Sequence, residues 1–350
     1  MRALSAVDSV SVAIQRTREF LFRPFRWGTY LKLGLVAIIT EGSSSNMPSS
    51  SHGGGQPSGH GPLINTPFDI PAAWIAMGVA AVLLAMLLTL VVFYLITRLR
   101  FAFFHCLVYN HRDIKPGWRL YREPATRFFW LNVVVGLCFL LVVVLVALPF
   151  AAGFWQIFRE VQSGHKPDIA LLLTVVLPLI PIIVLLALAG IVTDLVLRDW
   201  MMPHFAFDNA TAGEAWRQVW TSIRAETRQF LVYALLRVVL PTVAMAAVFM
   251  VLLIPGLMLA GALAAIGYGI HSAFTESTGT AAVAGLILQG FFGVVAGIFA
   301  LFASVCVGAP VSTGIREYAL TFYGGRYPAL GAVLDAPVPE LPPETAPGLA

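Results

Sequence analysis

The sequence predicts an all-α integral membrane protein with six transmembrane helices arranged as three hairpins, each preceded by a cytoplasmic amphipathic interfacial helix. Three observations lead to this fold class. The 350 residues are 58% hydrophobic and only 11% charged, whereas a soluble domain carries roughly 25% charged residues. The apolar residues gather into runs of about 20 or more, the length that crosses a bilayer. Lysine and arginine are distributed very unevenly between the segments that join these runs.

The runs define the spans. They cover about residues 26–40, 72–97, 128–154, 169–197, 237–266 and 281–311. The first is the weakest, because its apolar part, Gly28–Thr40, has 13 residues and contains Lys32. At 1.5 Å per residue it covers about 20 Å of a hydrocarbon core of about 30 Å. It crosses if the helix extends back through Trp27 while Lys32 reaches the interface. The alternative is a re-entrant or interfacial segment.

The basic residues indicate the orientation of the chain. Residues 1–32, 98–127, 198–237 and those after 311 together hold 20 lysines and arginines, and the intervening loops hold two, Arg159 and Lys166. Cytoplasmic loops of membrane proteins carry this excess of positive charge. We therefore expect a multi-pass protein of a bacterial inner or archaeal cell membrane, with both termini in the cytoplasm. This bias also favours a full crossing by Gly28–Thr40.

The domain organisation follows from the composition of the remaining segments. Residues 1–326 form a single six-span membrane domain, and no second, soluble domain is visible. The Gly/Ser-rich stretch 42–66 is predicted to be a disordered loop on the far side of the membrane. The Pro-rich residues 327–350 are predicted to be a disordered tail.

The best-marked interfacial helix has the sequence "GEAWRQVWTSIRAETRQF" (residues 213–230). Thr211 and Glu214 have the spacing of a capping box that begins it. Aromatic side chains share one helical face, and basic side chains share another: Trp216 and Trp220 on the first, and Arg217, Arg224 and Arg228 on the second. A helix of this composition lies in the membrane interface and attracts anionic lipid.

Two other segments before a span have the same character. Residues 5–27 begin with an S-x-x-D box at Ser5 and Asp8, and the apolar stripe is expected at Val7, Val10, Ile14 and Leu21. Residues 115–130 are the third such segment. The interface residues that these two segments contribute are Arg16, Arg18, Trp27, Trp118, Arg119 and Arg122. Any helical membrane protein places Arg and Trp at its cytoplasmic edges, so an ancestral repeat remains one of two interpretations.

Two family resemblances are visible in these segments. The opening "AIQRTREFLFRPFRWGTYLKLGLVAIITEG" resembles that of an uncharacterised family of prokaryotic integral membrane proteins, which begins with a T-R-x-F-L-x-P-F block followed by a Trp. The block Ala215–Phe230 is similar to membrane domains attached to some glycerophosphodiester phosphodiesterases. No soluble phosphodiesterase portion is present, so that activity is not implied. Neither resemblance implies a mechanism.

Ionisable residues at membrane depth are candidates for a functional site. They are Lys32, Asp194, Arg198 and Arg237. Asp194 and Arg198 are four residues apart and can pair at the end of the fourth span, where an anchoring ion pair and a proton or cation site are the two interpretations. Arg237 can reach the interface or pair with Asp194. Prolines 178, 181, 241 and 255 interrupt the fourth and fifth spans, as in transporters, but also as in membrane helices generally.

The sequence contains no motif that predicts catalysis, a cofactor, a metal or nucleic-acid binding. His204 and Asp208 share a helical face but have no third ligand. We therefore expect a non-enzymatic membrane protein that engages anionic lipid, a membrane-protein partner or a second copy of itself through its Arg/Trp helices. The alternative is a small transporter or channel that uses the Pro-broken spans, with Asp194 as the coupling site.

Overall fold

A computed structural model describes residues 3–42, 72–163, 169–274 and 280–335. The predicted disordered loop therefore lies outside the described residues except for Gly42, which ends a helix. Within the described ranges every regular element is helical, and five helical stretches are long and apolar enough to cross a membrane. The predicted all-α class is thus confirmed at this coarser level.

Three of the long helices extend well beyond the predicted spans, one begins and ends earlier than predicted, and one nearly coincides with its span. The long elements are α3 (Ala72–Val108), α5 (Arg122–Ala147), α7 (Ile169–Leu195), α10 (Thr227–Phe274) and α11 (Thr280–Gly324). The short ones are α1 (Asp8–Phe22), α2 (Trp27–Gly42), α4 (Ile114–Leu120), η1 (Leu148–Phe150), α6 (Ala151–Gln162), η2 (Val196–Met201), α8 (Met202–Phe207), α9 (Ala212–Ala225) and α12 (Pro328–Leu334). The extra turns of the long helices carry the residues that pack together.

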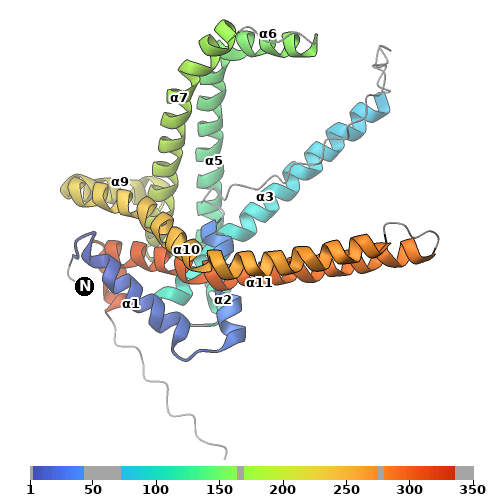
Figure 1. Cartoon of the computed structure of the whole chain (residues 1–350). Coiled ribbons are helices and arrows are strands. Elements are labelled where there is room, and N and C mark those ends of the chain that lie inside the picture. Colours follow the sequence, from blue (N-terminus) through green and yellow to red (C-terminus); the bar gives the residue numbers. More distant parts are fainter. Residues whose placement is uncertain (1–2, 43–71, 164–168, 275–279, 336–350) are drawn as a thin grey trace, which may run out of the picture.

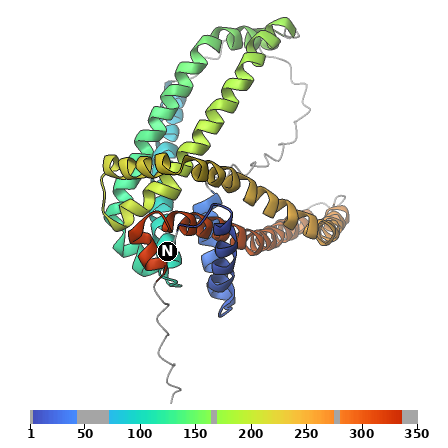
Figure 2. The same cartoon turned by 90° about the vertical axis from the view of Figure 1, so that its left-hand side faces the viewer.

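The long helices converge on one packed region and diverge from it as three arms: α3, the unit α5–α6–α7, and the pair α10–α11 (Figures 1 and 2). We call the packed region the inner core. It is rich in aromatic side chains, among them Trp200, Phe230, Tyr233 and Phe322. Tyr233 stacks on Phe322 with ring centroids 4.4 Å apart, and Trp200 meets Phe230 edge to face at 4.8 Å. The arms, by contrast, expose most of their large apolar side chains, as membrane-spanning surfaces do.

Helix α2 packs across α11 at small residues. A Cβ on Gly34 would lie 2.6 Å from that of Ala309, so the two backbones approach closely at this crossing. The hydroxyl of Tyr30 donates to the carbonyl of Cys306 over 2.7 Å. With 16 residues, α2 is shorter than the five candidate spans. The sixth crossing and the three-hairpin layout therefore remain predictions.

The packed face of α1 differs from the predicted apolar stripe. Its buried residues are Ser9, Ala13, Thr17, Phe20 and Leu21, and the helix lies against α11 in Figure 1. Of the predicted stripe only Leu21 is buried, while Val7 and Ile14 are exposed. Small residues occupy the packed face because they let α1 approach α11 closely. At Gly314 of α11, for example, an added Cβ would already lie 3.6 Å from the Thr17 hydroxyl.

Two boundaries also need correction. The third predicted interfacial segment, 115–130, is divided between the short helix α4 and the first turns of α5. The predicted disordered tail begins too early, because α12 occupies Pro328–Leu334 and buries Leu330 and Leu334. A proline at the first position suits a helix start, since it has no N–H to leave unpaired. Residues 336–350 of that tail lie outside the described residues.

Candidate functional site

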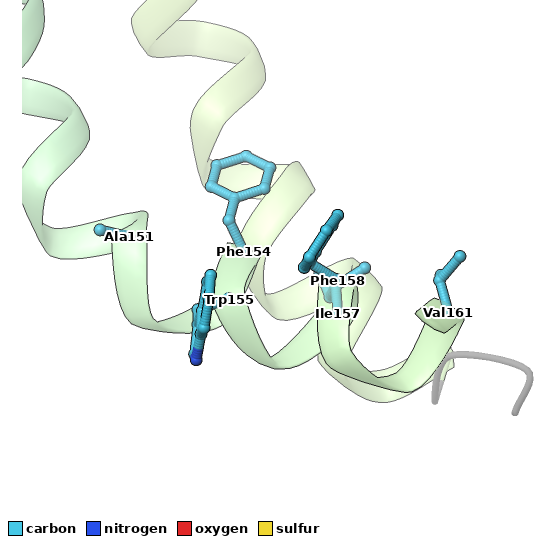
Figure 3. Close-up of a pocket in the computed structure, with 6 residues that line it drawn as sticks. All are labelled: Ala151, Phe154, Trp155, Ile157, Phe158 and Val161. Atoms are coloured by element: carbon cyan, nitrogen blue, oxygen red, sulfur yellow. The ribbon is translucent and has the colours of Figure 1, made fainter. Parts of the chain in front are cut away.

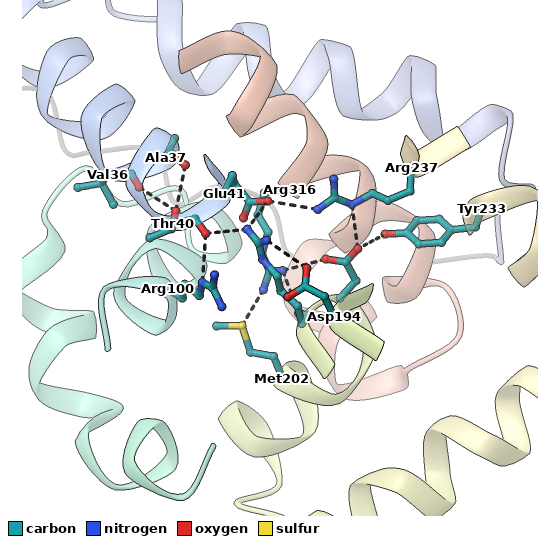
Figure 4. A network of polar contacts seen from close by, with 12 residues as sticks. Val36, Ala37, Thr40, Glu41, Arg100, Asp194, Met202, Tyr233, Arg237 and Arg316 are labelled. Atoms are coloured by element: carbon teal, nitrogen blue, oxygen red, sulfur yellow. Dashed lines mark hydrogen bonds and ion pairs between the residues drawn. The ribbon is translucent and has the colours of Figure 1, made fainter. Parts of the chain in front are cut away.

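The most unusual feature of the inner core is a cluster of buried charged side chains, which we call the ionic cluster (Figure 4). Its members come from five elements: Glu41 of α2, Arg100 of α3, Arg198 and Asp199 of η2, Arg237 of α10 and Arg316 of α11. Asp194 of α7 lies at its edge. Charged residues are rarely buried unless they are paired, so the pairing within this cluster determines whether the helices can converge here.

The C-terminal end of α2 provides one half of the cluster. The Glu41 carboxylate pairs with Arg198 at 2.7 Å and with Arg237 at 3.3 Å. The carbonyl of Thr40 accepts hydrogen bonds from Arg198 at 2.7 Å and from Arg100 at 3.1 Å. The end of a helix leaves its last carbonyl groups without intrahelical hydrogen-bond donors. Here the guanidinium groups of Arg198 and Arg100 donate to one of these carbonyls, that of Thr40.

Asp199 is the centre of the other half. Its carboxylate accepts from the Tyr233 hydroxyl at 2.8 Å and from Arg237 Nε at 2.9 Å. It also pairs with Arg316 at 3.2 Å. One carboxylate thus joins η2, α10 and α11, and Arg237 connects it to Glu41.

A π-helical turn makes this arrangement possible. Residues Val196–Met201 form η2, and all six are buried. The wider turn places the sequence neighbours Arg198 and Asp199 both inside the protein, where they meet different partners. Arg316 donates to the backbone carbonyl of Arg198 over 2.9 Å, within the same turn. Single π turns inside α-helices occur often at functional sites.

The structure brings together three of the four predicted intramembrane residues. Asp194 and Arg198 form the expected pair, with 3.6 Å between their closest charged atoms. Arg237 joins the same cluster, but it pairs with Asp199 and Glu41 and not with Asp194 as one interpretation expected. Lys32 is exposed and is not part of the cluster.

Sequence reasoning missed Glu41, Arg100, Asp199 and Arg316. Each lies just beyond the end of an apolar run, where a charged residue is normally a sign of the membrane boundary. The sequence held one indication for Asp199. It directly follows Arg198, whereas an anchoring ion pair such as Asp194–Arg198 has its partners four residues apart, so Asp199 needs a partner elsewhere. Nothing in a single sequence shows that these side chains, which lie far apart along the chain, meet at one place.

Helix α9 provides a second candidate site, at the surface. The predicted capping box is present: Glu214 accepts from the Thr211 backbone N–H over 2.9 Å, and its own N–H donates to the Thr211 hydroxyl. The hydrogen bonds that the Thr211 backbone N–H and hydroxyl donate to the Glu214 carboxylate hold its pKa below the ordinary value. Ala215 and Val219 face the core and are completely buried. The capping box and this narrow apolar contact fix how α9 lies on the protein.

The aromatic and basic side chains of α9 remain uncovered. Trp216 is 47% exposed and Trp220 is 40% exposed, and their rings stack 5.7 Å apart. The Arg224 guanidinium lies 5.0 Å from the centre of the Trp220 ring, a cation–π contact. Arg217 and Arg228 are exposed as well. Helix α9 ends at Ala225 and therefore presents two indoles and two guanidinium groups, those of Arg217 and Arg224. Arg228 lies in the first turn of α10, so the single helix predicted for residues 213–230 is divided at Glu226.

The other predicted interface residues divide into two groups. Arg18, Trp27, Arg119 and Arg122 are exposed. Arg16 instead pairs with the buried Glu317 at 3.0 Å, and Trp118 lies under the Arg98 guanidinium at 4.5 Å. These last two side chains hold α1 on α11 and α4 on α3, so they are engaged within the protein.

In the described part of the chain the regular elements are all helical and five stretches are able to cross a membrane. Together with the buried ionic cluster they indicate a membrane protein. Residues 4–333 match a family of unknown function (DUF7544), and the chain belongs to that family. The expectation of an uncharacterised family is thereby confirmed. The motif-level resemblance and the one to phosphodiesterase membrane domains remain predictions. No curated protein and no solved structure matches the chain.

Proposed function

We propose that the protein is a non-enzymatic plasma-membrane protein that binds anionic lipid at the surface of α9. The observation that carries this proposal is the uncovered pair Trp216–Trp220 together with the exposed Arg217 and Arg224 of α9 and the exposed Arg228 in the first turn of α10. Tryptophan is favoured at the membrane–water interface because one part of its ring system is apolar and the other donates a hydrogen bond. Each arginine near an anionic membrane surface contributes about 1 kcal/mol to the free energy of binding.

Only some of the other predicted interface residues support this proposal, because only some have exposed side chains. Arg18, Trp27, Arg119 and Arg122 are exposed, so their side chains remain free to meet lipid as the proposal requires. Arg16 and Trp118 do not, because their polar and aromatic groups are engaged with Glu317 and Arg98. A membrane-protein partner or a second copy of the chain is the other occupant that this surface suits, and the test below separates it from lipid.

The triple variant Arg217→Gln, Arg224→Gln, Arg228→Gln tests the proposal. Three lost charges correspond to about 3 kcal/mol, so the affinity for anionic lipid should fall by roughly 100-fold. The measurement is native mass spectrometry of the full, detergent-purified chain during titration with phosphatidylglycerol, and phosphatidylcholine binding should stay unchanged.

The matched control replaces the same three arginines by lysine. It keeps the charge, so it should retain most of the phosphatidylglycerol binding. Equal binding by the wild type and the glutamine variant would refute the proposal. A second copy or another protein bound in place of lipid would assign the surface to a partner.

The ionic cluster favours a second candidate function, transport of protons or ions across the membrane. Charged networks inside membrane proteins often mark ion and proton pathways, and this one includes a π turn and touches α3, α7, α10 and α11. Asp194 is the member with access to solvent or lipid, because its side chain is 45% exposed. In this proposal it takes up and releases the coupling proton, and Arg198 holds it in place.

The variant Asp194→Asn tests this second function. Proteoliposomes that contain a trapped pH-sensitive dye should show a proton flux with the wild type and lose it with the variant. The matched control is Asp208→Asn, since Asp208 is similarly exposed but lies beside His204, away from the cluster. Wild-type flux through the Asp194 variant, or no flux through the wild type, would exclude Asp194 as a coupling site.

A further inference from the structure

The arm formed by α5, α6 and α7 has a length that matches a bilayer. From Phe128 to Ala147, α5 contains no charged residue. At 1.5 Å per residue these 20 positions measure about 30 Å, the thickness of the hydrocarbon core. The exposed residues Arg127 and Trp130 lie at the end near the inner core, in the positions that basic and aromatic anchors occupy at an interface. The other end of α5 therefore reaches the opposite interface.

At that far end the chain turns sharply. The short η1 element Leu148–Phe150 contains a proline and separates α5 from α6. Figure 1 shows α6 running across the end of the arm and not along α5 or α7. The sequence prediction placed residues up to 154 in the span and 155–168 in a loop, so this 12-residue helix is a feature that only the structure reveals.

Apolar and polar residues occupy opposite sides of α6. Phe154, Phe158 and Val161 follow one another at i, i+4 and i+7, and in Figure 3 they project from the same side of the helix. With Ala151, Trp155 and Ile157 they border an open hollow of about 690 Å³. Trp155 and Phe158 stack with centroids 5.9 Å apart. The opposite arc carries the polar residues Gln156, Arg159 and Glu160.

The position of α6 is set by α7. A Cβ on Gly153 would collide with the side chain of Val175, so the two helices approach at backbone distance here. Val175 is buried although most of its neighbours in α7 are exposed. Gly153 lies at the border between the aromatic and the polar face of α6, so its contact with α7 leaves the aromatic face uncovered.

We propose that α6 is a second interfacial helix, on the side of the membrane opposite α9, whose aromatic side inserts among the acyl chains of the far leaflet. Two observations favour lipid as the occupant. The aromatic side chains of α6 lie at the end of an arm in which most of the described large apolar side chains of α5 and α7 are exposed. The length of α5 also places α6 at the depth where an amphipathic helix buries its apolar face about 5–10 Å into the boundary.

The proposed role of the remaining residues follows from the same placement. The Arg159 guanidinium lies on the polar arc, where it meets lipid phosphate groups. Trp155 lies at the border between the two arcs, the position that suits an indole ring with one apolar and one polar part. The helix would fix the depth and tilt of its arm, because sliding the arm along the membrane normal would expose three aromatic rings to water.

A fluorescent probe at two positions of the full chain tests this inference. Phe158→Cys and Gln156→Cys are made in a background in which Cys106, Cys138 and Cys306 are alanine, and each new cysteine carries an environment-sensitive dye. Reconstituted into phosphatidylcholine/phosphatidylglycerol vesicles, the dye at position 158 should lose most of its emission to lipids that carry a spin label near the headgroup end of the acyl chain. The dye at position 156 should instead be quenched by aqueous iodide. If the cysteine-free background fails to fold, a genetically encoded fluorescent amino acid at the same positions replaces the dye.

A second readout tests the side of the membrane. A membrane-impermeant maleimide added to intact cells should block the thiol of the Gln156→Cys variant, because α6 lies on the far side. Iodide quenching at both positions would place α6 in water and overturn the inference. A dye at position 158 that neither quencher reaches, together with crosslinking to another copy, would assign the aromatic side to a protein contact and also overturn it. Labelling of the Gln156→Cys variant only after cell lysis would exclude the far-side placement. None of these results depends on lipid binding at α9.

Discussion

Replacing Asp199 by alanine is expected to destabilise the folded protein by about 3–5 kcal/mol, the cost of removing one partner from a buried ion pair. Asp199 is 2% exposed and accepts from Tyr233, Arg237 and Arg316. Its loss leaves two guanidinium groups and a hydroxyl facing one another without the carboxylate that joins them. The free energy of unfolding is measured by SDS titration of the chain in mixed micelles.

Asp194→Ala is the matched control for this prediction. The Asp194 side chain is 45% exposed, and 3.6 Å separates it from Arg198. An exposed ion pair contributes about 0–1 kcal/mol, so this variant should unfold at nearly the same SDS concentration as the wild type. Equal stability of the Asp199 and Asp194 variants would show that the ionic cluster does not hold the helices together.

Phe322→Ala is expected to cost a similar amount, about 3–5 kcal/mol, for a different reason. Phe322 of α11 is fully buried in the inner core, where it contacts Tyr233 and meets Phe230 edge to face at 5.4 Å. Removing the ring leaves a cavity among aromatic side chains that cannot collapse to fill it. The same SDS titration measures the loss, and size-exclusion chromatography after heating reports the loss of the compact state.

Phe299→Ala on the same helix is the control. Phe299 lies in the α10–α11 arm and is 46% exposed, so its ring faces the apolar solvent both before and after unfolding in micelles. We expect a change of less than about 1 kcal/mol, typical of a substitution at an exposed site. A larger effect at Phe299 than at Phe322 would mean that the arms, and not the inner core, provide the stability of the fold.

The fold class and the helical stretches were predictable because they depend on local composition. Runs of apolar residues are long, contiguous and free of charge, and each needs only its own backbone hydrogen bonds to form a helix. The capping box at Thr211 and Glu214 was predictable for the same reason, since both partners lie three residues apart. The boundaries were less predictable: α10 begins at Thr227, well before the predicted start of its span at Arg237. The turns of α10 before Arg237 carry Phe230 and Tyr233, which are buried by contacts with other helices, so the local sequence does not indicate that the helix begins there.

The face that each helix buries was harder to predict than the helix itself. On α1, hydrophobicity favoured Val7 and Ile14, yet the packed side consists of Ser9, Ala13 and Thr17. In a membrane protein apolar side chains gain little from contact with another helix, because lipid is equally apolar. Close approach of small residues and hydrogen bonds then decide the packing. The hydroxyl of Thr321, which donates to the Ser9 carbonyl over 3.3 Å, is one such contact.

By itself the sequence determined the class of the protein, its helical stretches, the N-terminal cap of α9 and the Asp194–Arg198 pair, because each of these depends on residues close together in the chain. Only the tertiary structure decided that Glu41, Arg100, Asp199 and Arg316 meet in one buried cluster, and that residues 151–162 form a helix across the end of an arm. The physical reason is the range of the interactions. A buried charge is tolerated only beside its counter-charge, and here the two partners are up to 196 residues apart, as in Glu41 and Arg237.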